Sequence, residues 1–228
     1  MIPIRDINPR HTWPWVNYLF LGGCILAFVY QLSLGDDVAA LVRRDAFVPA
    51  LLTEALARQD GALALDVLRR IAIATFLHGG WLHVGGNLLY LRVFGDNIED
   101  RFGHLGYAAF YLGAGVAAAL GQWWSAPDAT VPMIGASGAI AGVLGTYLVL
   151  YPRARVLTLF PVFIFLTLLE VPAIAFLGLW ALQNLLSGFL AITTDVSGGV
   201  AWFAHLGGFA FGVVVGLGFR LTHRKRWR

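Results

Sequence analysis

A few polar side chains interrupt long apolar stretches of this sequence, and their types could support nucleophilic chemistry. His83 and Asn87 stand four residues apart, which places them one turn apart on the same face of a helix. Ser137 lies in a later apolar stretch and His205 in the last one. A serine hydroxyl becomes a nucleophile when a base removes its proton, and histidine is the usual base near neutral pH. This set can therefore supply a nucleophile and its base.

Attack on a carbonyl group would create an oxyanion, which fixed hydrogen-bond donors must stabilise. The Asn87 amide and an imidazole can donate, as can the free N–H groups at the helix start where Ser137 lies. Structural interpretations stay open for each residue. Ser137 could be a small packing residue, His205 could bond a carbonyl group across helices, and Asn87 could join two helices.

Other chemistries have less support in the sequence. His78 and His83 are five residues apart and no HExxH pattern exists, so a zinc site is not expected. No pair of aspartates lies within two apolar runs, which argues against an aspartyl mechanism. The serine lies in a G-x-S-G pattern and lacks the G-x-S-x-G elbow of soluble hydrolases.

The composition indicates a membrane protein. Of 228 residues, 58% are hydrophobic and 13% are charged, whereas soluble domains average about 45–50% apolar and roughly 25% charged residues. With a mean hydropathy of +0.72, too few polar side chains remain to cover a water-soluble globule. The aromatic content of 14% excludes a disordered chain. A single cysteine excludes an intrachain disulfide scaffold. We expect an all-α membrane protein with one domain.

Six charge-free runs are long enough to cross a bilayer core of about 30 Å. A further run, 156–169, contains Pro161 and is shorter, so we expect an interfacial or re-entrant piece. The expected domain organisation is a cytoplasmic N-terminus (1–15), a six-helix membrane domain (16–219) and a basic tail (220–228). The expected spans are Val16–Leu34, Ile71–Leu91, Leu105–Trp124, Met133–Tyr151, Val171–Thr194 and Ser197–Phe219.

The distribution of arginines predicts that both termini are cytoplasmic. With six spans, both ends share one side, and the basic tail lies there. The opposite side receives a long first loop (35–70), where Val38–Val42 and Leu51–Leu56 show the spacing of amphipathic surface helices. Whether this loop is only a packed cap or takes part in chemistry is left open by the sequence.

Small residues spaced by four predict that two helices approach closely. Gly138 and Gly142 share this spacing in the fourth span, and Gly208 and Gly212 share it in the sixth. Such faces by themselves indicate helix packing alone. Alongside Ser137 and His205, they favour a site formed jointly by the two helices.

Three separated motifs in this order resemble the rhomboid family of intramembrane serine proteases, bacterial type. The motifs are His83-x-x-x-Asn87, Gly135-x-Ser137-Gly138 and Ala204-His205-x-Gly207-Gly208. The resemblance extends over nearly the whole chain, from the first span to the basic tail.

This resemblance implies a role for each matching residue. Ser137 would be the nucleophile and His205 its base, while His83, Asn87 and the backbone N–H groups of Ala136 and Ser137 would stabilise the oxyanion. Glu99 and Gly103 resemble a structural motif of the family. The fifth span would act as a gate and the loop over the site as a cap.

Two positions depart from the family pattern. Arg69-Arg70 stand late in the first loop where Trp-Arg is common, which puts the interfacial anchoring that Trp provides in doubt. Ala141 stands four residues after the serine, where an aromatic side chain often packs on the catalytic histidine. Another group must then hold the His205 ring, or the ring is held more loosely.

The function that these residues predict is hydrolysis of a peptide bond in or near the transmembrane segment of another membrane protein. The alternative is a non-catalytic membrane protein that binds client helices or acts as their chaperone. We expect the bilayer and a transmembrane substrate as partners, with no nucleic acid, metal or cofactor, in a bacterial inner membrane. The sequence does not indicate the oligomeric state.

Overall fold

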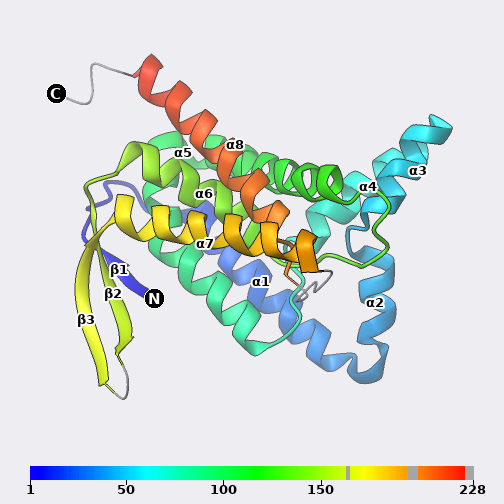
Figure 1. Ribbon diagram of the computed structural model, residues 1–228, viewed down its shortest axis with the longest axis horizontal. Coiled ribbons are helices and arrows are strands. Elements are labelled where there is room, and N and C mark those ends of the chain that lie inside the picture. The colour runs from blue at the N-terminus through cyan, green and yellow to red at the C-terminus, as the bar shows by residue number, and fades with distance from the viewer. Residues whose placement is uncertain (163–164, 195–199, 224–228) are drawn as a thin grey trace.

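The computed structural model describes residues 1–162, 165–194 and 200–223. Long helices form a bundle, a small sheet lies at one end with the N-terminus, and short helices lie at the opposite end (Figure 1). This arrangement confirms the predicted helical membrane bundle. The helices are α1 (Trp15–Ser33), η1 (Gly35–Asp37), α2 (Val38–Asp45), α3 (Pro49–Arg58), α4 (Gly61–Ala74), α5 (Trp81–Ser125), α6 (Ser137–Leu150), α7 (Ala173–Thr194) and α8 (Trp202–Thr222).

Helix α5 supplies two of the spans because it is broken at Gly103. This residue has φ 70° and ψ 165°, so the helix is interrupted there. An unbroken helix of 45 residues would be roughly 68 Å long, more than twice the thickness of a bilayer core. The two halves of α5 therefore lie in the positions of the second and third predicted spans. Helices α1, α7 and α8 are long and apolar enough to span, and α6 is a shorter apolar helix.

The buried carboxylate of Glu99 holds the start of α1 just before this break. It accepts hydrogen bonds from the backbone N–H groups of Val16 at 2.9 Å and Asn17 at 2.7 Å. These groups lie in the first turn of α1, where N–H groups lack partners within the helix and attract negative charge. His104 Nδ1 lies 2.5 Å from the same carboxylate. Glu99 and Gly103 thus fix how α1 packs against α5.

Helix α6 is the buried centre of the bundle and packs between α5 and α8. A Cβ atom at Gly138 or Gly142 would lie 2.5 Å from the Cβ of an alanine on α5. A Cβ atom at Gly208 or Gly212 would collide with the carbonyl oxygen of Gly138 or Gly142, respectively. The backbones of α6 and α8 are therefore in direct contact, as the spacing of small residues predicts.

The first loop folds into α2, α3 and α4, which confirms its predicted helical segments. Arg69 and Arg70, which stand where the family commonly has Trp-Arg, fasten α4 to the rest of the loop. Arg69 Nη1 lies 2.6 Å from the buried carboxylate of Asp45, and Arg70 Nη1 donates a hydrogen bond to the carbonyl oxygen of Arg43 at 3.1 Å. Within α4, Arg70 Nε also lies 2.6 Å from Asp66. The pKa values of both aspartates are lowered, chiefly by side-chain hydrogen bonds from Arg44 to Asp45 and from Arg70 to Asp66.

The predicted second span, Ile71–Leu91, is wrong at its beginning. Helix α4 ends at Ala74, a turn follows, and α5 begins at Trp81. His78 consequently lies in the turn and not on the span that carries His83 and Asn87. The run contains no charge to mark the division, and the paired glycines 79 and 80 within it provide the turn.

The segment 156–169, predicted as an interfacial or re-entrant piece, forms a β-hairpin. Strands β2 (Arg155–Val162) and β3 (Phe165–Pro172) pair antiparallel, and β1 (Ile2–Asp6) pairs antiparallel with β2, giving the order β1-β2-β3. A short apolar run is compatible with a strand or a buried helix, so its composition alone does not distinguish them. The hairpin connects α6 to α7 and joins the N-terminus to the same end of the bundle (Figure 1).

The carboxylate of Asp6 ties β1 to the bundle. It accepts hydrogen bonds from Tyr147 Oη at 2.7 Å and Asn97 Nδ2 at 2.8 Å. Burial raises the pKa of Asp6 to about 6, and the nearby negative charge of Asp96 also raises it, against the opposing effect of the Tyr147 hydrogen bond. The protonated form is thus favoured by the fold.

The contact between α6 and α8 can be tested with two substitutions on α8. We expect Gly212→Val to lower the free energy of unfolding by about 1–3 kcal/mol or more, because its side chain would collide with the backbone of α6. Gly218→Ala is the matched control: a Cβ there meets no atom within 4 Å, so a change below about 1 kcal/mol is expected. Unfolding in detergent micelles measures both. Equal effects of the two substitutions would contradict the contact.

The raised pKa of Asp6 predicts a dependence of stability on pH. The folded protein holds this proton more tightly than the unfolded chain, whose pKa is 3.8. The resulting stability is fully present below about pH 4 and is lost as the pH rises through about 6. Relative to the parent protein, Asp6→Asn should therefore become more stable between pH 4 and 7. Parallel curves of unfolding free energy against pH would show that Asp6 is not responsible.

Candidate active site

Ser137 and His205 meet at the starts of two helices in contact. Ser137 is the first residue of α6, and His205 lies in the first turn of α8. His205 Nε2 lies 2.8 Å from Ser137 Oγ, and both side chains are half-buried. The contact between α6 and α8 thus places a histidine nitrogen within hydrogen-bond distance of a serine hydroxyl, the geometry that a histidine base requires.

His83 and Asn87 lie on the other side of the serine loop, the segment 126–136 that leads into α6. Gly135 has φ +127°, and a Cβ atom there would lie 2.6 Å from His83 Nε2 and 3.7 Å from Asn87 Nδ2. A side chain at position 135 would therefore be strained and would also press on His83. The structure brings together His83, Asn87, Ser137 and His205, the four polar residues that the sequence indicated.

Each of the two α5 side chains, His83 and Asn87, presents an N–H group. The backbone N–H of Gly79 donates to His83 Nδ1 at 3.3 Å, so the ring proton lies on Nε2, the nitrogen nearer to Gly135. Asn87 Nδ2 is buried and, among the described residues, has no hydrogen-bond partner. Two N–H donors on α5 are thus available beside the serine loop, as an oxyanion site requires.

A cavity of about 60 Å³ adjoins Ser137. Thr75 and Ala204 line it from within the bundle, and Phe47 and Met133 line it from the loops. The backbones of Phe47 and Met133 exchange two hydrogen bonds, at 2.7 and 3.1 Å. The first loop therefore lies over the serine and is joined to the loop that leads into α6, and the cavity has room for a few water molecules.

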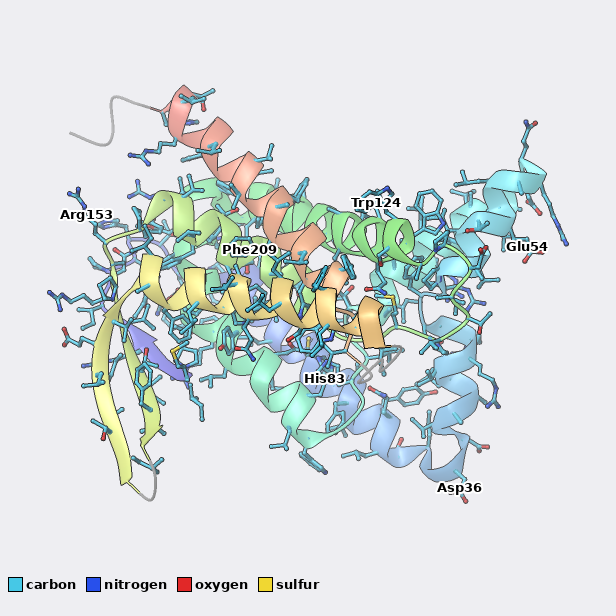
Figure 2. All side chains as sticks on the ribbon, viewed as in Figure 1. Asp36, Glu54, His83, Trp124, Arg153 and Phe209 are labelled. Atoms are coloured by element: carbon cyan, nitrogen blue, oxygen red, sulfur yellow. The ribbon has the colours of Figure 1, made fainter. Side chains whose placement is uncertain are left out.

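The site lies toward the first-loop end of the bundle. Figure 2 shows His83 on the side nearer to the first loop, where Asp36 and Glu54 are labelled, whereas Arg153 lies at the opposite end. The glycines of the expected motifs serve this placement: Gly135 leaves room for His83, and Gly138, Gly142, Gly208 and Gly212 bring the helices together. Ala136, immediately before α6, is buried, and the first N–H groups of the helix lack intrahelical partners.

Asn184, which is not among the predicted site residues, contacts the second nitrogen of His205. Asn184 Oδ1 lies 2.7 Å from His205 Nδ1, and the Trp180 ring centroid lies 5.8 Å from that of His205. These α7 side chains, with Trp202 at 6.2 Å between centroids, hold the ring in place of the aromatic residue missing at Ala141. The available signal was a single asparagine within the charge-free run 171–194.

Within the described residues, no group of three or more histidine, cysteine, aspartate or glutamate side chains is placed to hold a metal ion. The polar groups of the site are instead a hydroxyl, two imidazoles and two amides. They can transfer a proton and donate hydrogen bonds.

Fold and site together define a helical membrane protein with a half-buried serine–histidine pair beneath its first loop. Residues 66–221 match the rhomboid domain. The chain belongs to the rhomboid family.

Curated relatives agree with this assignment. The chain is 31% identical over 154 residues to rhomboid protein 1, mitochondrial, of Saccharomyces cerevisiae, covering 63% of this chain and 39% of that protein. It is 28% identical over 247 residues to RHOMBOID-like protein 4 of Arabidopsis thaliana, covering 98% of this chain and 57% of that protein. It is 41% identical over 70 residues to rhomboid-like protein 11, chloroplastic, of the same plant, covering 31% and 25%. The chain thus spans between a quarter and three fifths of these relatives.

The reactivity of Ser137 tests the geometry directly. A fluorophosphonate probe, which phosphonylates activated serines, should label the purified protein at Ser137, because His205 Nε2 can take the hydroxyl proton. Mass spectrometry of the labelled peptide identifies the site. Labelling should be lost in Ser137→Ala and should fall about 10²-fold or more in His205→Ala. Labelling that persists at its full rate in His205→Ala would exclude this histidine as the base.

Proposed function

We propose that this protein is an intramembrane serine endopeptidase with a Ser137–His205 dyad. The observation that carries this proposal is the 2.8 Å contact between His205 Nε2 and Ser137 Oγ, beside a cavity at the first-loop end of the bundle. Its membership of the rhomboid family supports the same activity.

The proposed reaction begins when Ser137 Oγ attacks the scissile carbonyl carbon and its proton passes to His205 Nε2. The carbonyl oxygen takes the displaced electron pair. It is then stabilised by His83 Nε2–H, by the Asn87 Nδ2 amide group and by the backbone N–H groups of Ala136 and Ser137. When the C–N bond breaks, His205 gives its proton to the leaving amine.

A water molecule completes the cycle. It attacks the acyl-enzyme ester while His205 takes one of its protons, and this proton returns to Ser137 Oγ when the ester bond breaks. The cavity beside Ser137 provides a place for this water within the bundle.

The substrate would be the transmembrane segment of another membrane protein. In a helix, the peptide carbonyl groups are engaged in hydrogen bonds, so a segment must unwind before its carbonyl carbon can reach Ser137. A cavity of about 60 Å³ holds no helix, which supports an extended segment at the site. In this proposal, α7 acts as the gate and the first loop as the cap.

The protein is an integral membrane protein, and we propose that both its termini lie in the cytoplasm of a bacterial cell, with the protein in the inner membrane. The excess of arginines at the end of the bundle that carries the sheet supports this orientation. The proposed membrane domain comprises residues 16–219, between an N-terminal segment (1–15) and a basic tail (220–228). The names of two relatives refer to the mitochondrion and the chloroplast, and these locations are those of the relatives.

The proposal predicts that purified protein in liposomes cleaves a test substrate with one transmembrane segment. Ser137→Ala and His205→Ala should abolish cleavage while the proteins remain folded. Asn87→Ala should lower kcat by about 10²–10³, since it removes one oxyanion donor and leaves the dyad intact. Gel analysis with mass spectrometry of the fragments measures all three.

Binding of the same substrate without cleavage by the parent protein would favour a non-catalytic helix binder. Equal cleavage by the Ser137→Ala variant would exclude the serine mechanism. The Gly218→Ala variant, altered away from the site on α8, should cleave at the parent rate.

A further inference from the structure

Asn184 is buried in α7 and has a fixed orientation. Its side chain is 4% exposed, and Nδ2 donates a hydrogen bond to the carbonyl oxygen of Trp180 at 2.8 Å, one turn earlier. The opposite orientation would place Oδ1 against that carbonyl oxygen, and two acceptors would repel each other. Asn184 Oδ1 is therefore the atom that lies 2.7 Å from His205 Nδ1.

This contact determines which nitrogen of His205 carries the proton. An amide oxygen only accepts hydrogen bonds, so Nδ1 must donate. In a neutral imidazole the other nitrogen, Nε2, then presents its lone pair, and this nitrogen faces the Ser137 hydroxyl at 2.8 Å. In the other tautomer an Nε2–H group would face the hydroxyl, and His205 could not take the serine proton.

We propose that Asn184 is a positioning residue that holds His205 in the tautomer that can act as a base. This inference rests on the proposed protease function. It adds Asn184, as a positioning residue, to the Ser137–His205 dyad. A neutral amide suits the site because a carboxylate inside an apolar span is costly, and α7 carries no charged residue within its described part.

The position of Asn184 also links the base to α7. Ser137 lies on α6 and His205 on α8, whereas Asn184 and Trp180 approach the same ring from α7. A movement of α7 by about 1 Å would stretch a 2.7 Å hydrogen bond beyond its useful range. His205 is therefore held as a base when α7 packs against α8. An opening movement of α7 would break the hydrogen bond between Asn184 and His205.

The test compares two substitutions at position 184 with one at the preceding residue, Gln183. Asn184→Leu keeps the approximate volume and removes the acceptor, so kcat should fall by about tenfold or more while KM changes less than about twofold. Asn184→Asp keeps an acceptor oxygen and should recover part of the lost rate. Gln183→Leu is the matched control, because Gln183 is exposed on the same helix and should leave kcat unchanged.

A spectroscopic measurement separates positioning from general stability. In ¹⁵N-histidine-labelled protein, which has six histidines, nitrogen chemical shifts distinguish the two tautomers, and His205→Ala assigns the signal. The parent should show His205 protonated at Nδ1, and Asn184→Leu should lose this preference.

The outcomes distinguish this inference from the proposed function. An Nε2-protonated His205 in the parent would overturn the inference without any variant, even if Asn184→Leu fails to fold. An unchanged kcat and tautomer in folded Asn184→Leu would also overturn it, while cleavage by the parent would leave the protease assignment standing. A parent that shows the expected tautomer and cleaves nothing would refute the protease and not the positioning.

Discussion

The backbone contact between α6 and α8 is the constraint on which the site depends. Serine and histidine side chains are short, so a hydrogen bond between residues on different helices requires the helix axes to come unusually close. Hydrocarbon provides no hydrophobic driving force between helices, so this approach relies on surfaces without side chains. The carbonyl oxygens of Gly138 and Gly142 occupy the space where side chains at Gly208 and Gly212 would lie. The hydroxyl of Thr146 adds a hydrogen bond to the Gly212 carbonyl at 2.8 Å.

The sequence allowed the main features to be predicted because low charge makes polar residues conspicuous. His83, Asn87, Ser137 and His205 stand out against apolar surroundings, and the small residues show which helices must touch. Asn184 was missed although it also interrupts an apolar run. Its partner depends on how α7 is rotated against α8, and no spacing within one helix carries that information.

The other differences between the predicted and observed elements arise in apolar runs, where no residue marks the end of one element and the start of the next. Residues 71–91 contain both the end of α4 and the start of α5, and hydropathy does not mark the turn between them. The sequence predicts an interfacial or re-entrant piece at 156–169, because this run is too short to span and contains Pro161, and it does not reveal the hairpin of β2 and β3. Their backbone groups are satisfied by pairing with each other and with β1, a long-range partner that local composition does not reveal.

The reciprocal hydrogen bonds between Phe47 and Met133 join the first loop to the segment that precedes Ser137. The loop that carries Gly135 is held from one side by these bonds and from the other by its own N–H group, which donates to the Ala74 carbonyl at 2.8 Å. Both anchors lie in or directly after the first-loop helices. The folded loop thus acts as a scaffold outside the bundle that fixes the segment leading into Ser137. The position of the nucleophile therefore depends on residues that lie far earlier in the chain and take no part in the chemistry.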